Sequence, residues 1–268
     1  GQEKRKPPSN SVGSVSAMDT KGTRELVLFC NSIINFLFWN ISGVSRAPNF
    51  RSLRFLVNHH VIQLVAICEP KVQAVDIHSI RMRLHMDQAI CNSRGDIWVL
   101  YKSSILCSLV GESSQHMSLY LSSLLFERPI TFSVTHAKCT DTERLELWSS
   151  LLVDNPDQSP WLIVGDFNVI VSAEEKRGGL PFRPAEGWDF LDFMSQAGVF
   201  DVGYSGSCFT WCNNRHGRAR IWKRLDRLLM NQVASNFAMD FSVHHLSRDP
   251  SDHAPLLLSA TTKLDNKP

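Results

Sequence analysis

Four short motifs place acidic, amide or imidazole side chains beside runs of apolar residues, where strands are expected to end or begin. They are Trp39-Asn40, Glu69-Pro70-Lys71, Gly165-Asp166-Phe167-Asn168 and Ser251-Asp252-His253. Carboxylate and amide oxygens bind hard cations such as Mg²⁺, and carboxylates and imidazoles can transfer protons. Each motif by itself is more often a solvated strand end. The chemistry therefore depends on whether the fold brings the four motifs together.

The first two motifs follow the strands of a predicted strand, helix, strand unit. Residues 33–40 and 61–68 are apolar runs that are typical of buried strands. Apolar residues between them recur at helical spacing, namely Phe50, Leu53, Leu56 and Val57. The chain therefore opens with a strand, a helix and a second strand.

Short strands and amphipathic helices continue to the end of the chain. Four runs have the spacing of an antiparallel meander: residues 96–101, 105–110, 117–121 and 130–135. Thr142 can cap a helix that extends through Val153. The apolar face of that helix would carry Leu145, Trp148, Leu151 and Leu152. A helix from Glu186 to Ala197 would end at Gly198. We further expect strands at 161–164, 208–211, 241–245 and 255–259, and a short helix near 226–231. This order favours α/β layers with mixed sheets over a barrel.

The composition is that of a globular chain with one large domain. Of the 268 residues, 43% are apolar and 20% are charged. Residues 1–24 have the composition of a disordered leader, and 261–268 would form a C-terminal tail around a domain at 33–260. The apolar stretch 26–39 is too short and too interrupted for a membrane helix. Seven cysteines, scattered among apolar runs like reduced core thiols, indicate an intracellular protein of the nucleus or cytoplasm.

The net charge of +2 is too small for a surface that is basic throughout. A nucleic-acid partner therefore has to be argued from a local site, and residues 213–227 are a candidate. This loop holds one tryptophan among six cations: Trp222 with Arg215, Arg218, Arg220, Lys223, Arg224 and Arg227. Cations bind phosphates and an aromatic ring can stack on bases, so we expect DNA contact here and not merely a solvated loop. Cys208, Cys212 and His216 recur at intervals of four, but the fourth ligand of a structural zinc site is not evident.

The order of the polar motifs along the chain is Asn40, Glu69, Asp166 with Asn168, Arg224-Leu225-Asp226-Arg227, and Asp252-His253. This order resembles the endonuclease/exonuclease/phosphatase superfamily. The segments FWNISG, AICEPK, WLIVGDFNVI, FTWCNNRHGRARIWKRLDRLLMN and SDHAPLLL are similar to the endonuclease domain of plant LINE-type retrotransposons. The resemblance covers roughly residues 33–260.

The resemblance implies a four-layered α/β sandwich in which two packed mixed β-sheets are flanked by helices. It also implies a phosphodiesterase that depends on Mg²⁺, with Mn²⁺ as an alternative. Glu69 would be the principal metal ligand, with Asn40 and Asp252 nearby or in a supporting position. Many DNA-repair members carry an aspartate where this chain has Ser42, so one supporting carboxylate is missing.

The same resemblance implies roles for the remaining site residues. Asp166 would orient and deprotonate the attacking water, and Asn168 would donate a hydrogen bond to the phosphoryl oxygen. His253 would contact the scissile phosphate, held in orientation by Asp226. His136 stands where many members have a tyrosine that hydrogen-bonds the phosphate, and a histidine can donate the same bond.

We therefore expect a DNA-nicking endonuclease domain that leaves a 3′-hydroxyl. One alternative is a phosphatase of the same superfamily that acts on inositol phosphates or lipids. A second alternative is a catalytically decayed retroelement fragment that folds and binds nucleic acid without turnover. The expected partner is DNA, with no membrane. The protein is expected to be a monomer, and the parent element would supply a reverse transcriptase.

Overall fold

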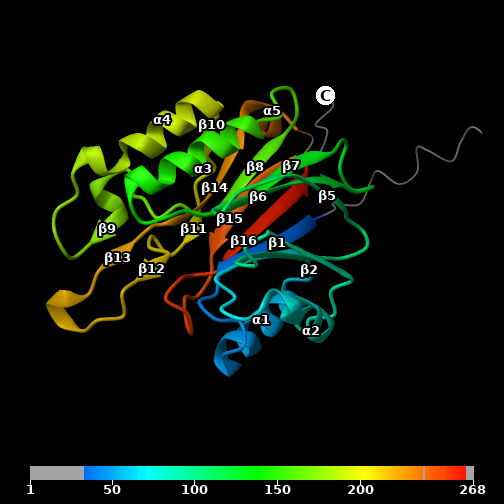
Figure 1. Ribbon diagram of the computed structural model, residues 1–268, viewed down its shortest axis with the longest axis horizontal. Helices are drawn as coiled ribbons and strands as arrows, with labels where there is room; N and C mark the ends of the chain where they lie inside the picture. Colours follow the sequence, from blue (N-terminus) through cyan, green and yellow to red (C-terminus); the bar gives the residue numbers. More distant parts are fainter. Residues whose placement is uncertain (1–32, 238, 264–268) are drawn as a thin grey trace, which may run out of the picture. The chain divides into compact units, whose positions relative to one another are not determined.

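The strand-forming runs of the sequence assemble into two large mixed β-sheets that pack face to face (Figure 1). The computed structural model describes residues 33–237 and 239–263. The predicted leader, residues 1–24, lies outside the described residues, as do residues 264–268 of the predicted tail. Residues 261 and 262 of that tail belong to the last strand. No described helix is long and apolar enough to cross a membrane.

The first sheet has β1 at its centre, paired in parallel with β2 and antiparallel with β16. In spatial order its strands are β11 (Ser205–Gly206), β15 (Met239–His245), β16 (Leu256–Thr262), β1 (Ile33–Asn40), β2 (Ile62–Cys68), β4 (Ile97–Tyr101) and β3 (Gln88–Cys91). Strands β1 and β2 agree with the predicted strands to within one residue. Their long apolar runs are buried almost throughout, as expected for central strands.

The second sheet has a parallel pair, β7 and β8, near its middle. In spatial order its strands are β10 (Val199–Asp201), β14 (Asp226–Asn231), β8 (Trp161–Asp166), β7 (Ile130–His136), β6 (His116–Ser122) and β5 (Leu106–Glu112). Strands β5, β6 and β7 form an antiparallel meander, as predicted. The prediction that β4 belongs to this meander is wrong. Strand β4 pairs with β2 and β3, because the chain crosses to the second sheet in the turn after Tyr101.

Helices cover the outer faces of both sheets, namely α1 (Ala47–His59), α2 (Ile77–Arg83), α3 (Asp141–Val153) and α4 (Trp188–Ala197). The short α5 (Gln232–Ser235) instead contributes Ala234 to the apolar cluster between the sheets. In Figure 1, α1 and α2 lie below the first sheet, and α3 and α4 lie above the second. The predicted four-layered sandwich is therefore confirmed.

Three apolar clusters fill the spaces between these layers. Between the sheets, the rings of Phe36 and Phe132 meet edge to face with centroids 5.6 Å apart. Trp39, on the opposite face of β1, packs in the cluster under α1 and α2. Trp148 of α3 stacks on Phe193 of α4 at 4.8 Å. Neighbouring strand residues thus enter different clusters, as the pleat of a strand requires.

The predicted short helix at 226–231 is wrong, because these residues form strand β14. The strand pairs antiparallel with β8 on one side and β10 on the other. Leu228 enters the cluster between the sheets, and Leu229 enters the cluster under α3 and α4. Two adjacent leucines can face opposite cores only in an extended chain.

Two further details of the helices differ from the sequence analysis. Thr140, and not Thr142, caps α3, since its hydroxyl accepts a hydrogen bond from the backbone N–H of Glu143. Leu145 is 55% exposed, while Leu147 is fully buried. The sequence analysis also missed α2 and β3, which are short and have little periodicity. Predicted helix 186–197 begins at Trp188, after a 3₁₀ turn at Pro184–Gly187.

A small third sheet projects beside the second one and carries the basic loop (Figure 1). It consists of β12 (Trp211–Cys212), β13 (Trp222–Lys223) and β9 (Lys176–Arg177). Strands β12 and β13 form a hairpin with a 3₁₀ turn, Gly217–Ala219, near its tip. The predicted strand at 208–211 is therefore shifted and reduced to two residues.

Candidate active site

The carboxyl ends of parallel strands bring the first two motifs together. In the first sheet, Asn40 ends β1 opposite Cys68, the last residue of β2. Glu69 follows directly and adopts a left-handed conformation, with φ of 51°. Side chains that leave neighbouring parallel strands at their ends meet at one edge of the sheet. The fold therefore places Asn40 and Glu69 side by side.

The second sheet contributes three more groups at the same edge. His136 ends β7 opposite Asp166, which ends β8, and Asp226 begins β14 on the other side of Asp166. Gly165 lies against β7 so closely that a Cβ there would meet the backbone oxygen of Thr135 at 2.2 Å. This close approach accounts for a glycine immediately before Asp166.

Asn40 connects the two sheets. Its Nδ2 donates a hydrogen bond to Asp166 Oδ2 at 3.0 Å and lies 3.5 Å from Glu69 Oε1. The same nitrogen is 3.5 Å from His253 Nε2. One buried amide thus touches members of three of the four sequence motifs.

His253 lies between two buried carboxylates. Its Nδ1 is 2.9 Å and 3.2 Å from the oxygens of Asp226, and its Nε2 is 3.6 Å from Asp166 Oδ2. Burial lowers the pKa of His253, but the carboxylates of Asp226 and Asp166 outweigh burial and raise the pKa to about 10. Burial raises the pKa of Asp166 to about 6, although the positive charge of His253 opposes this shift. At neutral pH the group is therefore an imidazolium held by two carboxylates.

Backbone contacts hold the histidine in this position. Trp39 Nε1 donates to the carbonyl oxygen of His253 at 3.0 Å, and His253 N donates to Ser251 Oγ at 3.2 Å. On the partner side, Thr210 Oγ1 accepts from the backbone N–H of Asp226 at 3.1 Å. Thr210 is fully buried, and the sequence analysis did not identify it.

Glu69 has a basic side chain at each carboxylate oxygen. Oε1 lies 3.2 Å from His136 Nε2, and Oε2 lies 2.8 Å from Lys71 Nζ. The hydrogen bond from His136, together with Lys71, holds the pKa of Glu69 well below its usual range, although burial opposes the shift. Lys71 also donates to Ser42 Oγ at 2.8 Å. Lys71 thus connects Glu69, the candidate metal ligand, with Ser42, which stands where many family members have an aspartate.

The oxygen groups at this edge fit a hard divalent cation. Asn40 Oδ1 is buried and has no hydrogen-bond partner among the described residues, and the Glu69 carboxylate is ionised beside it. Such amide and carboxylate oxygens are suited to Mg²⁺. Asp166, Asp226 and His253 also lie within 4.8 Å of one another. In that group, however, Asp226 is occupied by His253, and Asp166 accepts hydrogen bonds from Asn40 and from the backbone of Asn168. Asn40 Oδ1 has no such partner among the described residues, which favours Asn40 and Glu69 as the metal-ligand candidates.

Asp252 and Asn168 lie in the same cleft, with contacts of their own. Asp252 Oδ1 accepts from Ser251 Oγ at 3.3 Å, and no described hydrogen bond joins Asp252 to Asn40 or Glu69. Asn168 reaches the cleft by a turn, because β8 ends at Asp166 and Asn168 has a φ of 50°. Its backbone N–H donates to Asp166 Oδ1 at 3.0 Å, and its Nδ2 donates to a backbone carbonyl.

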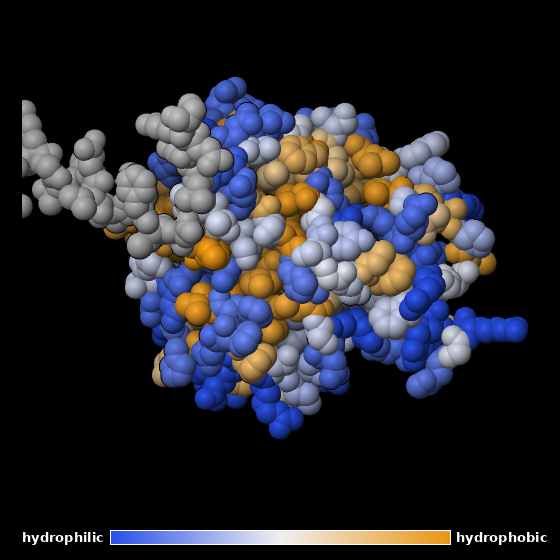
Figure 2. Space-filling view, turned by 180° about the vertical axis from the view of Figure 1, so that it is seen from behind, coloured by the Kyte–Doolittle hydropathy of each residue, from blue (hydrophilic) through white to orange (hydrophobic). Residues whose placement is uncertain are grey.

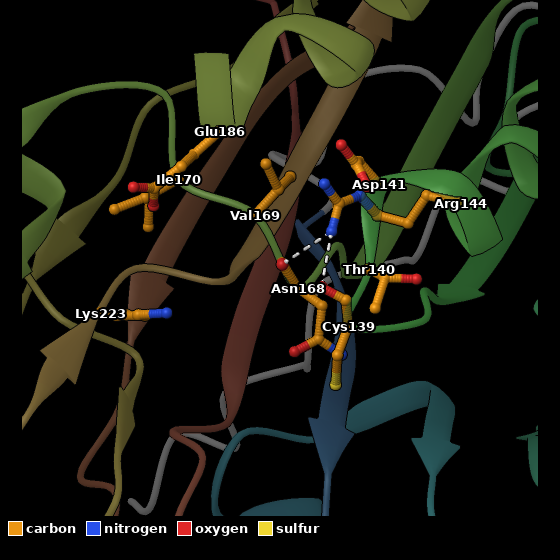
Figure 3. A pocket seen from close by; sticks show the side chains of 9 residues that line it. All are labelled: Cys139, Thr140, Asp141, Arg144, Asn168, Val169, Ile170, Glu186 and Lys223. Carbon is orange, nitrogen blue, oxygen red and sulfur yellow. Dashed lines mark hydrogen bonds between the residues drawn. The ribbon is translucent and has the colours of Figure 1, made fainter. Parts of the chain in front are cut away.

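Most of the predicted catalytic and metal-ligand residues line a cleft of about 470 Å³, whereas Asn40 and Asp226 do not. It is lined by Glu69, His136, Ala137, Lys138, Cys139, Asp166, Asn168, Trp211, Lys223, Leu225, Asp252 and His253. A smaller pocket of about 300 Å³ adjoins it and shares Cys139, Asn168 and Lys223 with it (Figure 3). Burial and the nearby Lys176 lower the pKa of Lys223. Lys223, predicted only as a DNA contact, therefore lies within the candidate active site.

The basic loop has an exposed tip and a buried base. Arg215, Arg218 and Arg220 are exposed. Trp222 is half-buried between two further cations, with Arg177 and Arg248 at 5.5 Å and 5.1 Å from the ring centroid. The sequence analysis did not identify these two arginines.

The prediction that Arg224 and Arg227 belong to the exposed loop is wrong. Both are buried, and both form ion pairs with Glu175 and Asp201. Arg224 and Arg227 flank Asp226 in the sequence, but neither of them lines the cleft. The zinc reading also has no support among the described residues. Cys212 is buried, Cys208 accepts a hydrogen bond from Tyr204, and neither belongs to a cluster of potential metal ligands.

The model of the Endonuclease/Exonuclease/phosphatase family matches residues 37–253. No sequence among the curated proteins matches the chain.

Several solved structures share the fold. The endonuclease domain of TRAS1, a telomere-specific non-LTR retrotransposon, is 12% identical, with a TM-score of 0.63 over 87% of this chain and 100% of that one. The AP endonuclease LMAP from Leishmania major is 14% identical, with a TM-score of 0.65 over 86% and 88%. TDP2 of D. rerio, solved with a single-strand DNA product, is 15% identical, with a TM-score of 0.61 over 87% and 100%.

Proposed function

Because this chain belongs to the endonuclease/exonuclease/phosphatase family, we propose that it is a divalent-metal-dependent phosphodiesterase that nicks DNA. The observation that carries the proposal is the single contact network of Glu69, Asn40, Asp166, His253 and Asp226 at one edge of the two sheets. The network joins ionised oxygen ligands to a buried acid-base pair beside an open cleft. Phosphodiester hydrolysis requires both kinds of group.

Glu69 and Asn40 would hold the metal ion, with Asp252 at the border of the cleft as a supporting group. The bound ion would neutralise negative charge on the phosphoryl oxygens and stabilise the leaving alkoxide. His136 and Lys71 contact the two oxygens of Glu69. These two basic side chains would keep the carboxylate ionised and oriented, and they would move away from it as far as the ion requires.

Asp166 would orient the attacking water and accept its proton. Hydrogen bonds from Asn40 and from the backbone of Asn168 orient its carboxylate, and its pKa of about 6 leaves it ionised at neutral pH. A carboxylate with a raised pKa is a better proton acceptor than an exposed one. The amide of Asn168 has a second N–H that can donate to the phosphoryl oxygen.

His253 would bind the scissile phosphate as a cation. Asp226 accepts a hydrogen bond from Nδ1–H, and Nε2–H, which is 3.6 Å from Asp166 Oδ2, lies in the wall of the cleft, where it can also donate to a phosphoryl oxygen. Preorganised donors of this kind stabilise the charge that develops on the phosphoryl oxygens. Lys223 and His136 line the same cleft, and their basic groups can also donate to the phosphate.

DNA is proposed as the substrate from two observations. The TRAS1 domain and LMAP are named as endonucleases, and TDP2 was solved with a single-strand DNA product. The β12–β13 hairpin of this chain also presents Arg215, Arg218, Arg220 and Trp222 beside the cleft. Cations with a stacking aromatic suit a nucleic acid better than a small inositol phosphate. The product would be a nick with a 3′-hydroxyl, as in the retroelement endonucleases that the motifs resemble.

A supercoiled-plasmid nicking assay tests this proposal. The purified chain should relax plasmid with Mg²⁺ or Mn²⁺ and should do nothing in excess chelator. Glu69→Gln should need more metal for the same rate, while its thermal unfolding stays close to that of the wild type. Nicking that persists in chelator would refute the metal mechanism.

The same assay distinguishes an active enzyme from a catalytically decayed fragment. The matched variant is Asp166→Asn, which keeps the shape of the side chain and removes its charge. If the wild-type chain folds and binds DNA but nicks no faster than Asp166→Asn, the chain is a catalytically decayed fragment. Release of phosphate from inositol phosphates without any plasmid nicking would instead favour the phosphatase alternative.

A further inference from the structure

Charge is segregated between the two helical layers of the sandwich. Helices α1 and α2 carry four arginines and no carboxylate: Arg51, Arg54, Arg81 and Arg83. Helices α3 and α4 carry one arginine and five carboxylates: Arg144, Asp141, Glu143, Glu146, Asp189 and Asp192. One layer thus has a formal charge of +4 and the other of −4. The small net charge of the chain conceals this separation.

The arginines of the α1–α2 layer form no salt bridge among the described residues, although Arg81 donates hydrogen bonds to the backbone oxygens of Met86 and Asp87. Arg46, Arg51 and Arg54 are exposed, and no salt bridge to any of them occurs among the described residues. Arg83 lies over the ring of Phe50 at 3.8 Å, which ties α2 to α1 and leaves its charge at the surface. In contrast, Arg144 of the acidic layer is buried and paired with Asp189. The lower part of Figure 2, where α1 and α2 lie, is mostly hydrophilic.

This basic layer is continuous with the candidate active site. Helix α1 begins seven residues after Asn40, and α2 begins eight residues after Glu69, so both helices start at the catalytic edge. A hollow of about 700 Å³ adjoins the cleft and shares Glu69, His136 and Lys138 with it. The hollow also holds Lys71 and Arg94, which form ion pairs with Glu69 and Asp96. It extends the cleft along residues 70–74, the segment that leads into α2.

We infer that the α1–α2 layer binds the phosphate backbone of the DNA flank that leaves the cleft. This inference rests on the proposed nuclease function and extends its substrate to DNA longer than the cleft. Duplex DNA carries about one charge per 1.7 Å of axis, and α1, with its 13 residues, is about 20 Å long. The two arginines of α1, Arg51 and Arg54, stand three positions apart, which is about 4.5 Å along the helix axis, so together they can reach neighbouring phosphates. The backbone of DNA is the polyanion that a phosphodiesterase cleft already brings to this edge.

Binding measured at two DNA lengths tests the inference. The full 268-residue chain is titrated, in chelator, onto labelled duplexes of about 8 and about 30 base pairs; at roughly 3.4 Å per base pair only the longer one extends past the cleft. The double variant Arg51→Glu, Arg54→Glu should lose most of the affinity that the wild type gains with length, on the order of ten- to a hundredfold. Its slope of log Kd against log salt should be smaller by about 2. Affinity for the short duplex should be nearly unchanged.

A matched control changes the same amount of charge elsewhere. Arg128→Glu combined with Lys263→Glu also lowers the formal net charge from +2 to −2. Both residues are exposed and belong to neither the α1–α2 layer nor the lining of the cleft. This control should keep the affinity for the long duplex within about threefold of the wild type. The milder pair Arg51→Gln, Arg54→Gln gives the same comparison if the reversed variant does not fold.

Two outcomes overturn the inference. The first is an equal loss of long-duplex affinity in the control and in the Arg51, Arg54 variant, because only net charge would then matter. The second is self-association of the wild type in sedimentation that Arg51→Glu, Arg54→Glu abolishes, because the basic layer would then bind the acidic layer of another copy. A wild type that binds neither duplex would contradict the proposed function itself, which separates the two failures.

Discussion

The sharpest test of the tertiary structure is a single change in a buried ion network behind the site. Glu175 is 8% exposed, and its carboxylate accepts hydrogen bonds from Arg227, Arg224 and the backbone N–H of Val171. Arg227 is 1% exposed and also pairs with Asp201. The network connects the base of the small third sheet to β14, which begins with Asp226. Glu175→Gln removes one charge and preserves the shape of the side chain.

Glu175→Gln is expected to lower the free energy of unfolding by a large amount for a change in one side-chain group. Removing one partner of a buried ion pair leaves the other charge uncompensated and costs about 3–5 kcal/mol. Asp201 and two backbone carbonyls remain beside Arg227, so we expect the lower end, about 3 kcal/mol. For a domain of this size the melting temperature should fall by roughly 6–12 °C.

The effect should depend on pH in a defined direction. Burial raises the pKa of Glu175, but the hydrogen bond and charge of Arg227 outweigh burial and hold the pKa below its usual range. The pKa of Asp201 is likewise lowered by Arg224, against burial. A carboxylate whose folded-state pKa is depressed stabilises the fold above its unfolded pKa of about 4.3, and this contribution is lost as pH falls toward the folded value. The difference between wild type and Glu175→Gln should therefore be full at pH 7 and should shrink below pH 4.

Thermal unfolding of both proteins between pH 7 and pH 3 measures the effect. The adjacent Glu174→Gln is the matched control, because Glu174 is exposed and its change should shift the melting temperature by less than about 2 °C. Equal shifts for the two variants would refute the reasoning that the buried network stabilises the fold. A difference that grows on acidification would refute the assigned sign.

The remaining predictions concern activity. Asp166→Asn and His253→Ala should each lower the nicking rate by about 10²–10⁴-fold. The double variant should be scarcely slower than either single variant, because the two side chains act on one phosphate. Rate losses that multiply in the double variant would contradict a shared role. His136→Tyr restores the usual family residue but removes a cation from Glu69, so the Mg²⁺ concentration for half-maximal rate should change, and an unaltered metal dependence would show that this contact is unimportant. Arg218→Glu with Arg220→Glu should weaken DNA binding and reduce its salt slope by about 2, while hydrolysis of a small model phosphodiester stays the same; unchanged DNA affinity would make the hairpin tip a solvated loop.

The local sequence pattern was sufficient to predict an element where the periodicity of that element alone determined its structure. The strand at 33–40 coincides with β1, and the four predicted apolar residues of α1 are all buried. The order of the motifs identified the family, which the family model confirms. These features follow from periodicity and residue type, which are properties of a short stretch of chain.

Local pattern failed where two cores or two charges compete for one residue. Residues 226–231 have the composition of a short helix, yet Leu228 and Leu229 face different clusters and the segment is a strand. Arg224 and Arg227 look like the other cations of the loop, but Glu175 and Asp201 bind them in the interior. Their partners are distant in sequence, so no pattern near residue 224 indicates burial.

The amino-acid sequence by itself determined the family, most of the strands and the residue types available for catalysis. The tertiary structure alone decided which of these groups touch, because that depends on the register of parallel strands and on the packing of two sheets. Asn40 meets Asp166 across 126 positions of the chain, and His253 meets Asp226 across 27. The tertiary structure also decided where charge accumulates. A chain with a net charge of +2 folds with a basic helical layer on one face and an acidic helical layer on the other. Net charge is a sum over residues, whereas the electric field that a DNA strand meets depends on where those residues lie.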